Sequence, residues 1–137
     1  MGHIYTISQI AKVAGVGVET IRFYQRQKLL ETPSKKMGSI RHYDETHVEK
    51  IEFIKKSQSV GFTLLEIKEL LKLRLSPNSD CTPIKKKTQI KIAEVEQKIE
   101  DLENILEALK RFESKCNSKE TTGKCSILDG IKELPNG

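Results

Sequence analysis

The sequence predicts a mainly α-helical chain with one small β hairpin: a head of short helices, followed by a long helix that pairs with a second chain. Two short apolar-faced segments near the N-terminus flank a turn that contains glycine. Between residues 88 and 109, apolar side chains recur at alternating steps of four and three residues. The chain has 137 residues, 36% of them hydrophobic and 31% charged, which suits a small core joined to a long solvated helix.

The first element is a pair of short helices. Thr6 and Gln9 have the spacing of a capping box, and Gly15 ends the helix that begins there. The apolar side chains that share its inner face are Ile7, Ile10, Ala11 and Ala14. A second helix follows Val16-Gly17 and extends to about Lys28. Two short helices joined in this way predict a helix-turn-helix.

The next elements are a hairpin and two connecting helices. Thr32-Pro33 interrupts the helical pattern, and the basic segment from Lys35 to Tyr43 is expected to form a small β wing around Gly38. Asp44 is predicted to cap a helix that ends at Gly61, and Thr63 to cap the next. The head is thus expected to be a winged helix-turn-helix with connector helices over 1–75, followed by a linker loop over 76–82.

The long helix is expected over 83–115, with Thr82 as its N-cap and Pro83 as its first residue. Its heptad seam consists of Thr88, Ile92, Val95, Ile99, Leu102, Leu106 and Leu109. Such a narrow apolar seam needs a partner helix, which predicts a homodimer; packing of one long helix on its own head is the alternative. Residues 116–132 are expected to form a metal-binding loop and C-terminal segment, and 133–137 a flexible tail.

The three cysteines share a register with this seam. Steps of seven residues from Thr88 and Leu109 reach Cys81 and Cys116, which lie 35 residues apart, or roughly 50 Å along a helix. An antiparallel dimer would bring Cys81 of one chain to Cys116 of the other, and Cys125 could fold back to join them. Each dimer would then hold two sites of three thiolates. A parallel dimer would instead give one two-cysteine site and one four-cysteine site.

The donor set indicates a soft metal ion. All three histidines lie in the N-terminal half, so three sulfurs without a fourth ligand fit Hg(II), and also Pb(II), better than a closed zinc site. Thiols buried without a metal are the alternative. A metal-sequestering or redox protein with no DNA role is a rival from another class. An enzyme is not expected, because a Cys-His nucleophilic pair is missing from the expected thiol region.

Charge and composition set the expected surroundings. Residues 1–44 carry seven Lys and Arg against three Asp and Glu, which favours a polyanion such as DNA at the head. No signal peptide and no apolar run of membrane-spanning length is recognised, so a cytoplasmic protein without membrane contact is expected. Three cysteines in a reducing compartment also argue against a disulfide framework.

Three segments carry a family resemblance: Thr6 to Ala11, Gly17 to Tyr24, and Arg41-His42-Tyr43. With them the sequence resembles the MerR family of metalloregulators, and within it the mercury-responsive members. The resemblance covers nearly the whole chain. The cysteine spacing of 35 and then nine residues is similar to that of the mercury sensors, and the lead sensors share it. Asn117 follows Cys116 where the zinc sensors have a second cysteine, which argues against a zinc role.

The resemblance implies a regulator that represses and activates a mercury-resistance operon, with Hg(II) as effector. A Pb(II)- or Cd(II)-responsive regulator is the alternative. It implies promoter DNA and RNA polymerase as partners, and metal sites shared between the two chains. The metal ligands implied are Cys81, Cys116 and Cys125. The DNA-binding residues expected are Thr20, Arg22, Tyr24, Arg26, Arg41 and Tyr43, although the arginines could be solvated surface and the tyrosines half-buried packing residues.

Overall fold

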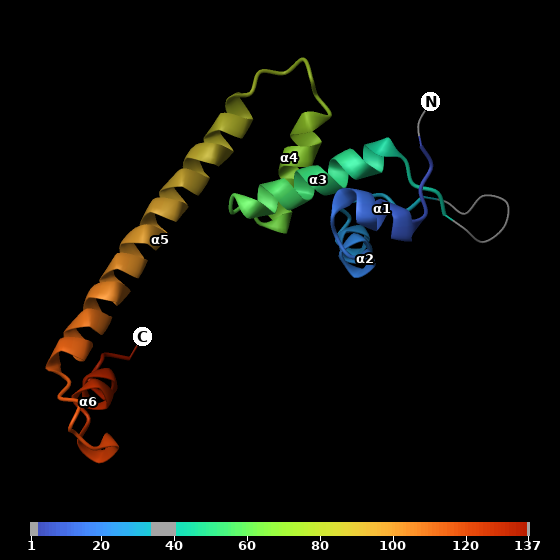
Figure 1. Cartoon of the computed structure of the whole chain (residues 1–137). Coiled ribbons are helices and arrows are strands. Elements are labelled where there is room, and N and C mark those ends of the chain that lie inside the picture. The colour runs from blue at the N-terminus through green and yellow to red at the C-terminus, as the bar shows by residue number, and fades with distance from the viewer. Residues whose placement is uncertain (1–2, 34–40, 137) are drawn as a thin grey trace. The chain divides into compact units, whose positions relative to one another are not determined.

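The computed structural model of the chain describes residues 3–33 and 41–136 (Figure 1). The elements are α1 (Ile7–Ala14), α2 (Val18–Arg26), α3 (Glu45–Ser59), α4 (Leu64–Arg74), α5 (Thr82–Lys115), a 3-10 turn (Thr122–Lys124) and α6 (Ser126–Lys132). They confirm the predicted all-helical class with one long helix. The chain divides into two compact units, 1–87 and 88–137, and α5 passes from the first into the second.

The turn between α1 and α2 is fixed by backbone geometry. Thr6 and Gln9 form the predicted capping box of α1, with each side chain bonded to the other residue's backbone N–H. Gly15 ends α1 in the left-handed conformation at φ 70°, a region that favours glycine. Lys55 of α3 donates from Nζ to the Gly15 carbonyl at 2.9 Å. This bond ties the turn to the rest of the head.

The β structure of the described residues consists of isolated bridge residues, and one complete pair lies among them. Tyr5 and Tyr43 form an isolated antiparallel bridge, with N–H to carbonyl distances of 2.7 and 2.8 Å. The bridge fastens the segment before α1 to the segment before α3. The expected wing around Gly38 falls in residues 34–40, outside the described residues.

The core of the first unit lies among its four short helices. Its α1 packs on α2 and α3, and α4 packs on α3. The fully buried side chains are Ile10, Ile21, Ile51, Ile54 and Ile67. Asp44 caps α3 as predicted in a capping box with His47, and Thr63 caps α4 in another with Glu66. This small apolar core fixes the orientation of α2.

The start of α5 differs from the prediction by one residue. The helix begins at Thr82 and not at Pro83. The backbone N–H of Thr82 donates to the Asp80 carboxylate at 2.9 Å. The Cys81 carbonyl accepts the first intrahelical bond from Lys85 N–H at 2.9 Å. Cys81 therefore occupies the N-cap position, and Asp80 supplies the capping side chain expected of Thr82.

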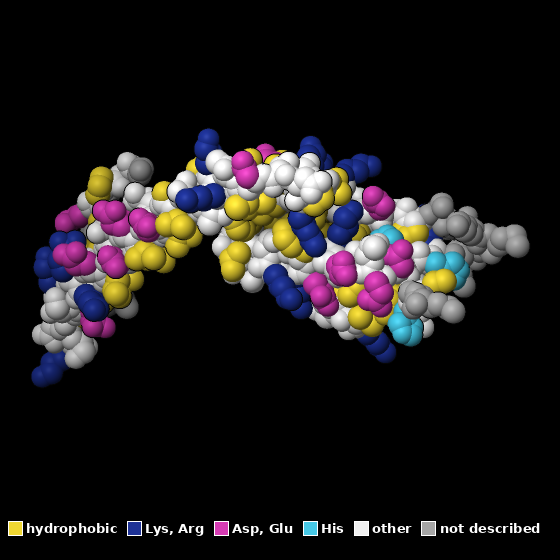
Figure 2. Space-filling model, turned by 90° about the horizontal axis from the view of Figure 1, so that it is seen from above, with side chains coloured by type: hydrophobic (Ala, Val, Ile, Leu, Met, Phe, Trp, Pro, Cys, Tyr) yellow, Lys and Arg dark blue, Asp and Glu magenta, His cyan; other side chains and the backbone are white. Residues whose placement is uncertain are grey.

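The heptad seam of α5 is exposed in the single chain. Val95 is 40% exposed and Leu102 64% exposed, and the other apolar seam residues lie between them. Figure 2 shows hydrophobic side chains along one side of this helix and charged ones along another. Among the described residues, no helix is both long and apolar enough to cross a bilayer.

The second unit ends in a short helix folded back on α5. A Cβ placed on Gly130 of α6 would lie 2.7 Å from Cε1 of Phe112, so the backbone of α6 rests directly on that ring. Glu133 and Leu134 donate backbone bonds to Asp129 and Ile131 at 3.1 Å. The bonded segment thus extends past the boundary expected at Glu133.

Candidate metal centre and nucleic-acid interface

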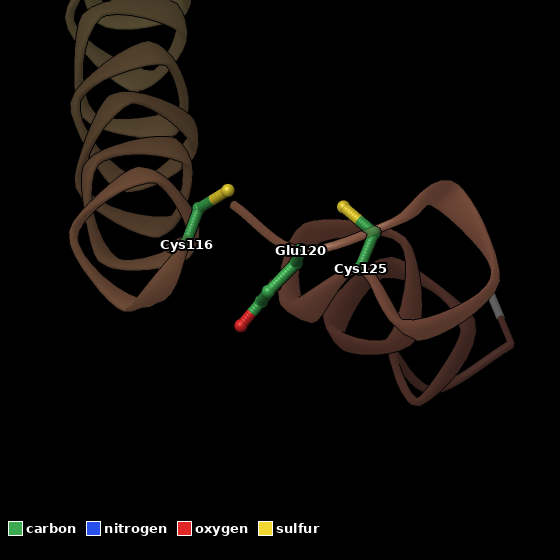
Figure 3. Close-up of side chains that lie close together, drawn as sticks. All are labelled: Cys116, Glu120 and Cys125. Atoms are coloured by element: carbon green, nitrogen blue, oxygen red, sulfur yellow. The ribbon is translucent and has the colours of Figure 1, made fainter. Parts of the chain in front are cut away.

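Two of the three cysteines meet at the end of α5. Cys116 follows the last residue of that helix and donates its N–H to the Glu113 carbonyl at 3.1 Å. The chain then turns, with Glu120 N–H bonded to the Asn117 carbonyl at 2.8 Å, and Cys125 follows immediately before α6. The sulfurs of Cys116 and Cys125 and a Glu120 carboxylate oxygen lie within 4.8 Å of one another (Figure 3). One chain therefore brings together two thiols and a carboxylate.

Glu120 is a member of this group that the sequence did not reveal. Its carboxylate accepts from the backbone N–H of Ser126 at 3.0 Å and from its hydroxyl at 2.9 Å. These bonds lower the pKa of Glu120, so the group remains a carboxylate. The prediction considered only cysteine and histidine as donors. A polar loop with one glutamate offered no signal that this side chain turns toward the cysteines.

The electrostatics of the group oppose an ionised Cys116. Desolvation raises the pKa of the Cys116 thiol, and the neighbouring Cys125 and Glu120 raise it further. Two sulfurs and a carboxylate side by side repel one another when all are ionised. A bound cation would relieve this repulsion, because a metal ion inverts the local preference for the protonated form.

Cys81 belongs to the first unit of the chain, whereas Cys116, Glu120 and Cys125 belong to the second. Its side chain is exposed at the start of α5. It lines a hollow of about 330 Å³ whose walls come from the end of α4, the linker loop and the first turn of α5. The Cys81 thiol is therefore accessible from solvent at the N-terminal end of α5.

The exposed side of α2 carries arginines. Arg22 is exposed and pairs with Glu19 one turn earlier at 3.1 Å. Arg26 is also exposed, and its guanidinium lies 5.9 Å from the centre of the Phe23 ring. Thr20 is half-buried near the start of the helix, and Arg41 is exposed on the segment before α3. Four of the six predicted DNA-binding residues thus have side chains that solvent reaches.

The two predicted tyrosines lie in the core. Tyr24 is 3% exposed and donates its hydroxyl to Gln58 of α3 at 2.9 Å. Tyr43 is 2% exposed, accepts a bond from Gln25 of α2 at 2.9 Å and packs edge-on against His47. Their position supports the packing alternative rather than direct DNA contact. Both hydroxyls engage other elements of the head and so help to orient α2.

A helix-turn-helix with exposed arginines, joined by a seam-bearing helix to a thiol centre, defines a class: DNA-binding regulators that respond to a metal ion. Comparison with known proteins agrees. The model of the MerR HTH family regulatory proteins matches residues 5–73, and a second one, described as MerR, DNA binding, matches residues 48–112. A mercuric resistance operon regulatory protein of Serratia marcescens is 41% identical over 135 residues, covering 96% of this chain and 92% of that protein.

Two solved structures share both fold and sequence with the chain. The transcription regulator PbrR691 of Ralstonia metallidurans CH34, in complex with lead(II), has a TM-score of 0.82 and 33% identity, covering 91% of this chain and 97% of that one. The regulator MerR of Bacillus megaterium MB1, in complex with mercury(II), has a TM-score of 0.67 and 30% identity, covering 94% and 100%. The chain belongs to the MerR family of DNA-binding transcription regulators, and it is a metal-responsive member rather than an enzyme.

Proposed function

We propose that this protein is an Hg(II)-responsive regulator that binds promoter DNA as a homodimer and controls a mercury-resistance operon. Each metal site is built from Cys116 and Cys125 of one chain and Cys81 of the other. Arg22 and Arg26 of α2 enter the major groove of the DNA, and Thr20 and Arg41 contact the sugar-phosphate backbone of the DNA. The regulator acts in the cytoplasm, where DNA and RNA polymerase are found.

The observation that carries the proposal is the meeting of Cys116 and Cys125 at one end of an unpaired seam. The apolar seam residues of α5 are at least 40% exposed in the single chain, and such a surface is stabilised by a second helix. Cys81 occupies the same seam line at the other end of that helix. Two copies of α5 running in opposite directions therefore complete a three-thiolate site at each end.

The choice of metal follows from the donor set. Thiolates bind soft ions most strongly, and three of them suit Hg(II). The curated relative from Serratia marcescens is named for mercuric resistance, which supports the same ion. The Glu120 carboxylate adds a harder donor within 4.8 Å of the sulfurs, and this observation favours a second candidate, a Pb(II)- or Cd(II)-responsive regulator.

The switch follows from a site shared between chains. A ligand shifts a conformational equilibrium only if it binds one state more tightly than the other. Metal held by both chains favours the dimer state in which Cys81 approaches the partner's thiol pair, and each α5 is continuous with a DNA-binding head. A change in the spacing of the two heads would alter the bend and twist of the bound promoter, so that RNA polymerase can engage it.

The proposal is tested by titrating the reduced dimer with Hg(II), Pb(II), Cd(II) and Zn(II). Sulfur-to-metal charge-transfer absorption reports binding, and transcription from the operator promoter reports the response. We expect two Hg(II) per dimer and activation at the lowest concentration with Hg(II). Activation by Pb(II) or Cd(II) at lower concentration than Hg(II) would replace the mercury assignment by the second candidate. Absence of a response to all four ions would overturn metal sensing.

A further inference from the structure

The loop between Cys116 and Cys125 needs an explanation for its closed form. Eight residues separate the two cysteines, and they are polar, with a glycine among them. A segment of this composition is flexible on its own, and closing it costs conformational entropy. Yet the structure holds the two sulfurs and a Glu120 carboxylate oxygen within 4.8 Å of one another.

Two contacts hold the loop closed. At its middle, the Glu120 carboxylate accepts from the backbone N–H of Ser126 at 3.0 Å and from the Ser126 hydroxyl at 2.9 and 3.1 Å. Beyond it, Gly130 rests on the ring of Phe112, where even a methyl group would come within 2.7 Å of a ring carbon. Ser126 directly follows Cys125 in the chain. A restraint on Ser126 therefore fixes the backbone that carries the Cys125 thiol.

We propose that Glu120 is a positioning residue of the metal centre, which holds Cys125 beside Cys116 through Ser126 before a metal ion arrives. The inference rests on the proposed metal-sensing role of this site. Bonds to an ionised acceptor are stronger than bonds between neutral groups, so one carboxylate can order the loop. Cys125 then does not need to be recruited by the metal, and the cost of ordering is met during folding. The partner's Cys81 is the one donor that must still arrive.

The test measures the proximity of the two thiols without metal. The full-length dimeric Cys81→Ser variant is equilibrated with oxidised and reduced dithiothreitol. Its remaining thiols are Cys116 and Cys125. One thiolate of the protein attacks the disulfide of the oxidised reagent and forms a mixed disulfide with it. The second thiolate of the protein then attacks this mixed disulfide and displaces the reagent. One sulfur–sulfur bond forms in the protein, and the reagent leaves as the dithiol with both protons. The equilibrium constant reports the effective concentration of one thiol beside the other.

We expect Glu120→Ala to lower this constant about tenfold, the effect of losing hydrogen bonds to a charged group. Glu120→Gln keeps an oxygen that can accept from Ser126, so it should restore part of the loss. Glu107→Ala, which removes an exposed glutamate of α5, is the matched control and should leave the constant unchanged. Equal constants in Glu120→Ala and Glu107→Ala would overturn the proposal. Peptide mapping confirms that the disulfide is Cys116–Cys125 of one chain.

A second arm separates this inference from the proposed function. With Cys81 intact, Glu120→Ala should weaken Hg(II) binding, measured by competition with a thiol chelator, in proportion to its effect on the disulfide constant. If the unmodified dimer does not bind Hg(II) while Glu120→Ala still lowers the constant, mercury sensing fails and the positioning role stands. If Hg(II) binds and the constant is unaffected, the positioning role fails alone.

Discussion

At the scale of the residue, each functional side chain depends on a fixed neighbour. The Arg22 guanidinium lies on the outer side of α2 because Ile21 and Tyr24 bury the inner side. Tyr24 anchors that side to α3 through Gln58. The same logic holds in the metal centre, where Ser126 restrains the carboxylate of Glu120. At both proposed sites, a buried or hydrogen-bonded neighbour thus holds the functional side chain in place.

Arg22→Ala is expected to weaken operator binding while leaving metal uptake unchanged. A base contact by arginine contributes about 1–3 kcal/mol, which is roughly a fivefold to 150-fold loss of affinity. Fluorescence anisotropy with operator DNA at fixed salt measures the change, and the exposed Lys56 of α3, replaced by alanine, is the control. Equal operator affinities for the Arg22 variant and the control would remove α2 as the recognition helix.

Asp44 makes the stability of the head dependent on pH. Bonds from Thr46 and His47 lower the pKa of this carboxyl from 3.8 to about 2. A lowered pKa adds stability above the unfolded value, and this is lost as the pH falls through the folded one. Asp44→Ala should therefore destabilise the protein by about 1 kcal/mol at pH 7, the typical cost of an N-cap, and by less at pH 3.

Urea unfolding at constant protein concentration measures this effect. Asp44→Asn is the matched control, because asparagine also caps helices but does not titrate. Its stability should stay close to that of the unmodified protein at pH 7. A gap between Asp44→Ala and the unmodified protein that does not shrink between pH 7 and pH 3 would contradict the titration of Asp44.

At the scale of the element, capping signals and periodicity were sufficient to predict most helices. Thr6, Asp44 and Thr63 cap α1, α3 and α4 as predicted, because a capping box depends on residues three positions apart. The start of α5 was misplaced by one residue, since Asp80 competes with Thr82 for the capping role. Local sequence contains both candidates and does not decide between them.

Side-chain burial was harder to predict than helix position. Tyr24 and Tyr43 were expected at the DNA, yet both hydroxyls are bonded inside the head. An aromatic side chain with a polar tip suits either environment, and only the packing of distant segments decides. The place of Glu120 depends likewise on a bond to Ser126, six residues later, in a loop without periodicity. Cys81 and Cys116 lie directly before and after α5, as their spacing predicts, because a helix converts sequence spacing into position.

The seam of α5 should determine the oligomeric state. Ile99→Glu places a charge in the middle of the seam, where burial against a partner would cost several kcal/mol. We expect this variant to be a monomer at micromolar concentration in sedimentation velocity experiments, while the unmodified protein is a dimer without metal. Asn104→Glu, five residues along and outside the seam, is the control and should remain a dimer. A dimer of normal affinity with Ile99→Glu would contradict pairing through α5.

At the scale of the whole molecule, the account depends on two chains supplying one metal site. Within one chain the structure gathers Cys116, Cys125 and Glu120, and it leaves Cys81 exposed in the other unit. In the proposed three-thiolate site the second chain supplies Cys81, and a site held by both chains can couple metal to the two DNA-binding heads. The direction in which the two α5 helices run determines which thiols share a site.

Mixed dimers test this claim most directly. Chains with Cys81→Ser are combined with chains in which Cys116 and Cys125 are both serine, and the mixed dimer is purified through two different tags. Neither parent dimer can form a three-thiolate site between antiparallel helices. The mixed dimer has one such site, so the account predicts one Hg(II) bound with three-sulfur charge-transfer absorption. Absence of that absorption in the mixed dimer, with strong multi-thiolate binding in the Cys81→Ser parent, would contradict it and indicate parallel helices.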